Sequence, residues 1–171
     1  MKEELKVFIR YFLTLFLVLI GAKLFTFIFT TLTIISVFKI LSLFYSTILR
    51  DTTISINNFN LVFIEACIAP SAYILITILN LSVPWKSTKK LMISLLLGYV
   101  LFLTINIARI ILLANLFIHN SVYFDEIHKF LWYSVSTFVV IFIWFFQVYA
   151  FKIKSTPFIT DINNFYLKTK P

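Results

Sequence analysis

Long uninterrupted apolar segments limit most strongly how this chain can fold. Of its 171 residues, 61% are hydrophobic and only 13% are charged. Apolar runs of about 20 residues match the length of a helix that crosses the hydrocarbon core of a bilayer. A soluble protein of this composition would expose large apolar patches and aggregate. The sequence therefore predicts one all-α integral membrane domain over residues 1–171.

Four segments have the length and composition of transmembrane helices, at about residues 11–30, 67–83, 91–118 and 128–151. The first is long and lacks a small-residue cleavage site, so we interpret it as an anchor and not as a signal peptide. Segment 31–49 fits either another span or an interfacial helix, because Lys39 and several Ser and Thr residues interrupt its apolar character.

Residues 50–66 differ from the rest of the chain. They alternate in polarity or are β-branched on both sides of an Asn pair, which predicts a small β-hairpin. The polar backbone of a hairpin is not tolerated in lipid, so we expect this hairpin to lie outside the membrane, on the extracytoplasmic side.

Basic residues indicate the orientation of the chain. A net charge of +8 is compatible with nucleic-acid binding, but the Lys and Arg residues gather at the ends of the apolar runs, as membrane topology requires. Four spans with both termini in the cytoplasm put three basic clusters on the cytoplasmic side, whereas a span at 31–49 would separate the first cluster from the others. We therefore favour an interfacial helix at 31–49. The clusters hold ten of the 15 basic residues: Lys2, Lys6 and Arg10; Lys86, Lys89 and Lys90; Lys152, Lys154, Lys168 and Lys170.

Counting residues along the helices from these clusters predicts that three reactive side chains lie at a similar depth in the membrane. Cys67 lies 19 residues before Lys86, and Arg109 lies 19 residues after Lys90. At 1.5 Å per residue, each is about 28 Å from the cytoplasmic boundary, close to the full thickness of the hydrocarbon core. His128 begins the fourth expected span at its outer end. A thiol, a guanidinium and an imidazole are therefore expected near the outer leaflet.

Cys67 is the only cysteine, which excludes an intramolecular disulfide. A lone cysteine in an apolar helix is usually a small packing residue. Pro70, however, fits the first turn of a helix, so Cys67 would lie near a helix N-terminus, where free N–H groups favour a thiolate. Glu65 acts against this unless it points away. Ser71 is one turn from Cys67 and either supports the site or packs between helices.

Arg109 and His128 supply the other groups that an activated thiol needs. An arginine among apolar residues costs about 2.5–3.5 kcal/mol unless it is paired or reaches water, so intramembrane charges are usually functional. Asn106, one turn earlier, is placed to orient the guanidinium. Asp125 is placed to hold the tautomer of His128. A thiol with an imidazole is the common arrangement of an activated nucleophile.

Other motifs have simpler explanations. His119 is a second imidazole, but it falls in the connector at 119–127, and Trp132 is interpreted as an anchor at the membrane interface. Lys23 within the first span either extends to the interface or faces another helix. Metal-ligand spacings and nucleotide-binding motifs do not occur, so no cofactor is expected.

The segments "IEACIAPSAY", "NIAR" and "FDEIHKFLWY" together resemble the exosortase/archaeosortase family of membrane-embedded cysteine transpeptidases. The resemblance covers about residues 50–150, including the strand-like segment before Cys67. It implies that Cys67 is the nucleophile, that Arg109 stabilises developing negative charge and that His128 transfers protons. Two features differ: family members commonly have Gly at the position of Ala69, and many have more spans.

The resemblance implies a function at the cell membrane. Cys67 would cleave the C-terminal sorting signal of an exported protein, which consists of a short motif, a transmembrane helix and a basic tail, and transfer the protein to a lipid or other envelope acceptor. Two alternatives remain at this point. A membrane cysteine protease would hydrolyse the same bond without transfer, and a non-enzymatic assembly or transport subunit would use Arg109 and Cys67 only structurally.

Overall fold

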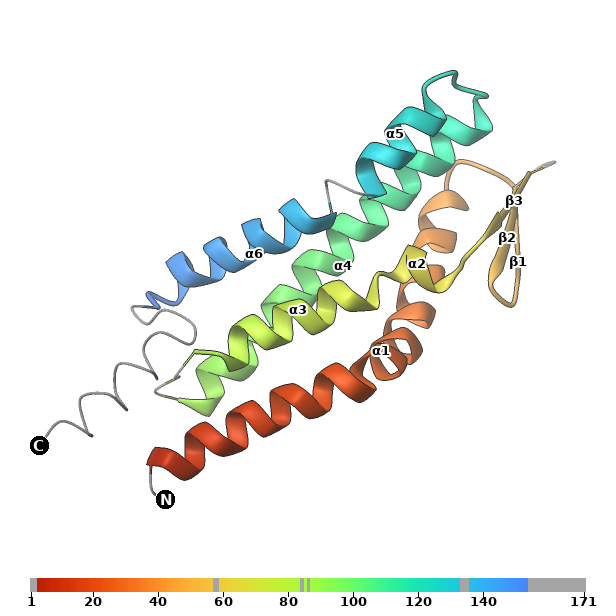
Figure 1. Ribbon diagram of the computed structural model, residues 1–171. Helices are drawn as coiled ribbons and strands as arrows, with labels where there is room; N and C mark the ends of the chain where they lie inside the picture. The colour runs from red at the N-terminus through yellow and green to blue at the C-terminus, as the bar shows by residue number, and fades with distance from the viewer. Residues whose placement is uncertain (1–2, 57–58, 84, 86, 133–135, 154–171) are drawn as a thin grey trace, which may run out of the picture.

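A computed structural model describes residues 3–56, 59–83, 85, 87–132 and 136–153 (Figure 1). Helices α1, α3, α4 and α6 pack alongside one another, and a small sheet and α5 lie together at one end of this bundle (Figure 1). In chain order the elements are α1 (Glu3–Leu41), β1 (Thr47–Arg50), β2 (Thr53–Ile56), β3 (Phe59–Val62), α2 (Glu65–Ile68), α3 (Pro70–Leu81), α4 (Thr88–Ile118), α5 (Phe124–Phe130) and α6 (Ser136–Ala150).

Helix α1 continues through the segment expected to form a separate interfacial helix. That prediction for 31–49 is wrong, because 31–41 belong to α1 and 47–49 belong to β1. Buried residues recur every fourth position from the middle of α1 to its end. Since a helical turn takes 3.6 residues, this stripe winds slowly round the helix and faces α3 first and the sheet later. The stripe consists of Gly21, Phe25, Phe29, Thr33, Val37 and Leu41.

The length of α1 explains how it serves two parts of the molecule. Its 39 residues span about 58 Å, roughly twice the hydrocarbon thickness of a bilayer. A membrane that α1 crosses therefore leaves part of the helix outside the lipid. The C-terminal part packs against the sheet through Ile34, Val37 and Leu41, together with Ile54 and Ile56 of β2.

Three antiparallel strands, in the order β1-β2-β3, replace the hairpin expected at 50–66. The sheet begins at Thr47, three residues earlier than expected, because β1 supplies a further strand before Asp51. On β2, Ile54 and Ile56 are fully buried and alternate with partly exposed residues, so one face of the sheet covers the core. The expected Asn57–Asn58 turn lies outside the described residues.

Within the described ranges, two helical segments are long and apolar enough to cross a membrane, Val7–Leu41 and Thr88–Ile118. The segments Pro70–Leu81 and Thr137–Ala150 are apolar but shorter. The structure thus gives two candidate spans where four were expected. Of the basic residues used to orient the chain, five lie outside the described residues: Lys2, Lys86, Lys154, Lys168 and Lys170.

The fourth expected span, 128–151, is not one helix that starts at His128. Helix α5 already begins at Phe124 and ends at Phe130, and α6 runs from Ser136 to Ala150. Asp125 and Glu126 occupy the first turn of α5, where acidic side chains stabilise the positive end of the helix dipole. His128 is therefore in the middle of a short helix.

A buried polar network joins three helices at the end of the bundle away from the sheet. Asn80 of α3 donates from Nδ2 to Oε1 of Gln147 (3.2 Å) and accepts at Oδ1 from the hydroxyl of Ser94 (2.7 Å). Gln147 of α6 donates from Nε2 to the backbone oxygen of Ser94 in α4 (2.6 Å). All three side chains are fully buried, and each bond fixes the position of one helix against another.

The absence of a side chain at Gly98 of α4 leaves space for Gln147 of this network and for Ile76. A methyl group at position 98 would come within 2.6 Å of Gln147 Nε2 and 2.8 Å of Ile76 Cγ2, so we expect Gly98→Ala to destabilise the protein by about 1–3 kcal/mol. At Gly21 the nearest atom is 3.3 Å away, and Gly21→Ala is expected to be neutral or stabilising by up to about 1 kcal/mol. Thermal unfolding of the two purified variants in one detergent measures the difference. Equal melting temperatures would contradict it.

Candidate functional site

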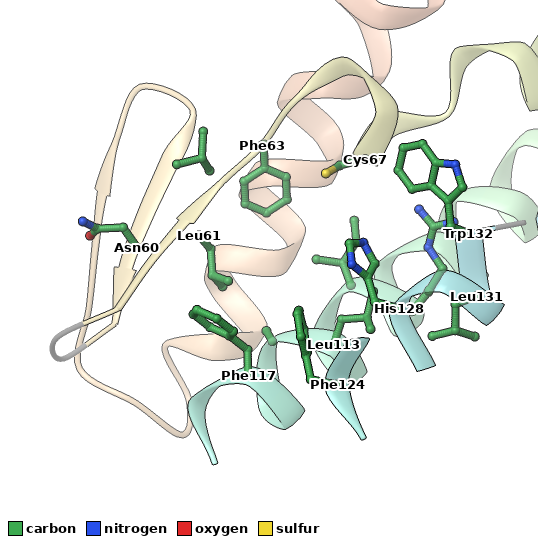
Figure 2. A pocket seen from close by; sticks show the side chains of 14 residues that line it. Asn60, Leu61, Phe63, Cys67, Leu113, Phe117, Phe124, His128, Leu131 and Trp132 are labelled. Carbon is green, nitrogen blue, oxygen red and sulfur yellow. The ribbon is translucent and has the colours of Figure 1, made fainter. Parts of the chain in front are cut away.

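A cavity of about 240 Å³ lies between β3, α2, α4 and α5 (Figure 2). Cys67, Arg109 and His128 all line it. The thiol, the guanidinium and the imidazole therefore come from three different helices and face one space, where apolar and aromatic side chains surround them. The remaining lining residues are Asn60, Leu61, Val62, Phe63, Ile110, Leu113, Ala114, Phe117, Phe124, Leu131 and Trp132.

Cys67 lies in the short helix α2, just before the tight turn that joins α2 to α3. It is the third residue of the four-residue helix α2, and its backbone N–H donates to the carbonyl oxygen of Ile64 (2.9 Å). Helix α3 begins three residues later with Pro70 at its first position, as the sequence indicates. The side chain of Cys67 is half-buried, so the sulfur is accessible from the cavity.

Ala69 makes this turn possible and adopts an unusual backbone conformation. Its φ of 54° and ψ of 57° are left-handed, and it both ends α2 and precedes α3. Glycine adopts this conformation without the steric cost that a β-carbon brings. Gly at position 69 would therefore fit this backbone better than Ala does.

Asn106 fixes the turn from the side of α4. Its Nδ2 donates to the backbone carbonyl oxygen of Cys67 (2.9 Å), and its side chain is 3% exposed. The sequence places Asn106 beside Arg109 as an orienting group. The hydrogen bond that the structure shows goes instead to the backbone of Cys67, so Asn106 positions the residue that carries the thiol.

Arg109 lies one turn after Asn106 and is half-buried. Arg109 and Cys67 line the same cavity. A positive charge that borders an apolar cavity attracts any negative charge that develops there more strongly than it would in water, because the surroundings screen less. The cavity thus combines a sulfur atom with a cationic group directed at the same space.

His128 lies on the face of α5 that borders the cavity and is exposed. Its ring lies between two aromatic rings, with centroids 5.5 Å from Phe124 and 6.3 Å from Trp132. These residues are spaced four apart, so they follow one side of the helix. Figure 2 shows the imidazole across the cavity from Cys67.

The expected supporting residues are placed differently. Asp125 is exposed and borders a separate surface hollow next to Asn120 and Ser121. Ser71 is exposed and is not among the residues that line the Cys67 cavity. His119 caps the end of α4, where its Nδ1 is 3.0 Å from the carbonyl oxygen of Asn115.

Glu65 has a structural explanation that the sequence does not supply. Its Oε1 accepts a hydrogen bond from the hydroxyl of Thr26 in α1 (2.9 Å). The carboxylate therefore ties α2 to α1, and it is not one of the cavity-lining residues. Lys23, one turn before Thr26 on α1, is exposed.

Strand β3 and Trp132 are parts of the site that the sequence interpretation missed. The four successive residues from Asn60 to Phe63 line the cavity, and Trp132, interpreted as a membrane anchor, lies beside His128. Sequence spacing could have indicated both. The strand reaches Cys67 within five residues, and Trp132 is one helical turn from His128.

In the part of the chain that the structure describes, no group of three His, Cys, Asp or Glu side chains is arranged to hold a metal ion. Comparison of the chain with protein-family models, with curated proteins and with solved structures finds no match. The chemical interpretation of the cavity therefore depends on its own residues.

The left-handed backbone at Ala69 leads to a direct test. Ala69→Gly removes the β-carbon that opposes this conformation and should stabilise the protein by about 1 kcal/mol. Ala108 lies exposed inside α4, where Gly is unfavourable, so Ala108→Gly should destabilise by about 1 kcal/mol. Thermal unfolding compares the two. Destabilisation by both changes would contradict the role given to the Ala69 turn.

Loss of the Asn106 hydrogen bond should be costly. Asn106→Leu has a similar volume but leaves the carbonyl oxygen of Cys67 without this donor, so we expect a loss of about 1–3 kcal/mol. It should also change the rate at which iodoacetamide alkylates Cys67, because the turn is no longer fixed. Asn115→Leu, at an exposed position of the same helix, is the control and should alter neither quantity.

Proposed function

We propose that the protein is a membrane-embedded cysteine transpeptidase similar to the exosortases and archaeosortases. The observation that carries this proposal is the cavity at which Cys67, Arg109 and His128 meet. These are the residues in the matching positions of the family's motifs. The left-handed backbone at Ala69 is a conformation that Gly adopts without steric cost, so it is compatible with the Gly that the family commonly has at this position.

In this proposal the chain crosses the membrane four times, and both termini lie in the cytoplasm. The crossing segments are α1, α2 with α3, α4 and α6. The residues from Glu65 to Leu81 rise about 25 Å, so α2 and α3 together approach the hydrocarbon thickness of a bilayer. Large apolar side chains face outward on α1 and α6, with Phe27 81% and Phe142 69% exposed. In a membrane, lipid would cover these apolar surfaces, whose exposure to water would be unfavourable.

The proposed reaction starts with attack by the Cys67 thiolate on a peptide carbonyl carbon of the sorting signal. The new C–S bond places negative charge on the carbonyl oxygen, which Arg109 stabilises. The C–N bond then breaks, a thioester forms, and the leaving amine takes a proton from His128. An acceptor amine or hydroxyl next attacks the thioester, returns a proton to His128 and releases the sulfur as thiolate.

The acceptor in this scheme is a lipid or another envelope component, and the substrate is an exported protein. The exposed position of His128 lets an acceptor approach the group that removes its proton. Hydrolysis by the same site differs only in the group that resolves the thioester. The mass of the product distinguishes the two, since hydrolysis leaves a free carboxylate and transfer adds the acceptor.

Cells that lack this protein and are complemented with variants test the proposal. Cys67→Ala removes the nucleophile, so exported proteins with a C-terminal apolar helix and basic tail should accumulate uncleaved. The rate of their processing should fall by at least about 100-fold. Arg109→Ala and His128→Ala should each slow processing by about 10²–10⁴-fold. Quantitative mass spectrometry of C-terminal peptides in the membrane fraction gives these rates.

Expression and folding must be equal for this comparison. Ser71→Ala, at an exposed position near the same turn, is the matched control and should process normally. Normal processing by Cys67→Ala at equal protein level would refute the transpeptidase and protease proposals. It would favour the non-enzymatic alternative, in which Cys67→Ser also leaves function intact.

A further inference from the structure

Strand β3 forms one edge of the sheet and leads directly to Cys67. Among the described residues the strand order is β1-β2-β3, so β3 pairs only with β2. An edge strand presents backbone N–H and C=O groups that can pair with a further strand. In Figure 2 β3 is the strand nearest the cavity.

The alternation of the backbone identifies which groups point outward. The N–H of Phe63 donates to the carbonyl oxygen of Thr52, on the β2 side (2.9 Å). Successive residues of a strand direct their backbone groups to opposite sides. The backbone N–H and C=O groups of Leu61 therefore point toward β2, and the backbone N–H and C=O groups of Asn60 and Val62 point toward the free edge.

The cavity follows this edge. Four successive residues, Asn60 to Phe63, line it, although side chains alternate between the two faces of a strand. A cavity bordered by residues of both faces runs along the edge of the strand. The apolar side chains of Leu113, Phe117 and Phe124 also line the cavity, whose unfilled space can take apolar side chains of a ligand.

We propose that an extended peptide binds as a fourth strand along β3, pairs with the backbone of Asn60 and Val62, and directs an apolar side chain into the cavity at every second position. This rests on the proposed function, because the peptide is the part of the substrate that precedes the scissile bond. The peptide runs parallel to β3, since both chains proceed toward Cys67. Main-chain pairing supplies the affinity, and the cavity selects the side chains.

A peptide that alkylates Cys67 tests the pairing on the purified full-length protein. The probe is acetyl-Val-Ser-Val-Ser-Val chloromethyl ketone, with which the sulfur forms a thioether to the methylene carbon and releases chloride. A series of probes carries one N-methyl group, at each amide in turn. We expect methylation at alternate amides to lower the alkylation rate about tenfold and methylation at the others to change it less than about twofold. Intact mass measures the rates.

A variant of the edge provides the matching test on the protein. Val62→Pro removes an N–H that faces outward and is tolerated on an edge strand, whereas Val62→Thr keeps it. Val62→Pro should react with the peptide about tenfold more slowly than Val62→Thr, while both react equally with iodoacetamide. Equal peptide rates, a uniform effect of N-methylation, or no preference for the peptide over chloroacetamide would each overturn strand addition.

These outcomes are separate from the test of the proposed function. The alkylation rates depend on the edge and the thiol, and they require no natural substrate. If cells with Cys67→Ala process their proteins normally, the transpeptidase proposal fails whatever the alkylation rates are. If processing fails in those cells while N-methylation has no alternating effect, only the strand-addition proposal is lost.

Discussion

The hydrogen bond from Asn106 to the backbone of Cys67 is the contact on which the geometry of the site depends. It joins the middle of α4 to a turn only a few residues long, and that turn contains a left-handed Ala69. A left-handed residue other than glycine persists only where its surroundings hold it. Asn106 supplies such a restraint from inside the bundle, and Glu65 supplies another through Thr26 of α1.

The two ends of the bundle have different physical character. Away from the sheet, the side chain of Asn80 bonds to the Gln147 amide and the Ser94 hydroxyl, and Gln147 bonds to the backbone oxygen of Ser94; all three side chains are fully buried. This end is fixed. Near the sheet, Cys67 and Arg109 are only half-buried and His128 is exposed, around a space that protein atoms do not fill. The polar network thus restrains α3, α4 and α6 against one another, whereas the end near the sheet contains an open space.

The convergence of Cys67, Arg109 and His128 could be inferred from the sequence because an α-helix has a constant rise. Counting from charged boundaries gives depth without knowledge of how the helices pack. The prediction failed for α1, because it ended the first span at about residue 30 and set 31–49 apart so that the three basic clusters stayed on one side of the membrane. The four-residue spacing from Phe25 to Leu41 is typical of one continuous helix, and no Gly or Pro lies between these two residues.

Contacts between elements distant in sequence could not be derived in this way. Asn106 has Arg109 as a near neighbour on its own helix, and sequence spacing shows only such neighbours. Its actual acceptor, the Cys67 carbonyl, is 39 positions away and becomes a neighbour only through tertiary packing. The same holds for Glu65 and Thr26. Residue types therefore indicated which groups carry the chemistry, whereas the groups that position them depend on how the helices approach one another.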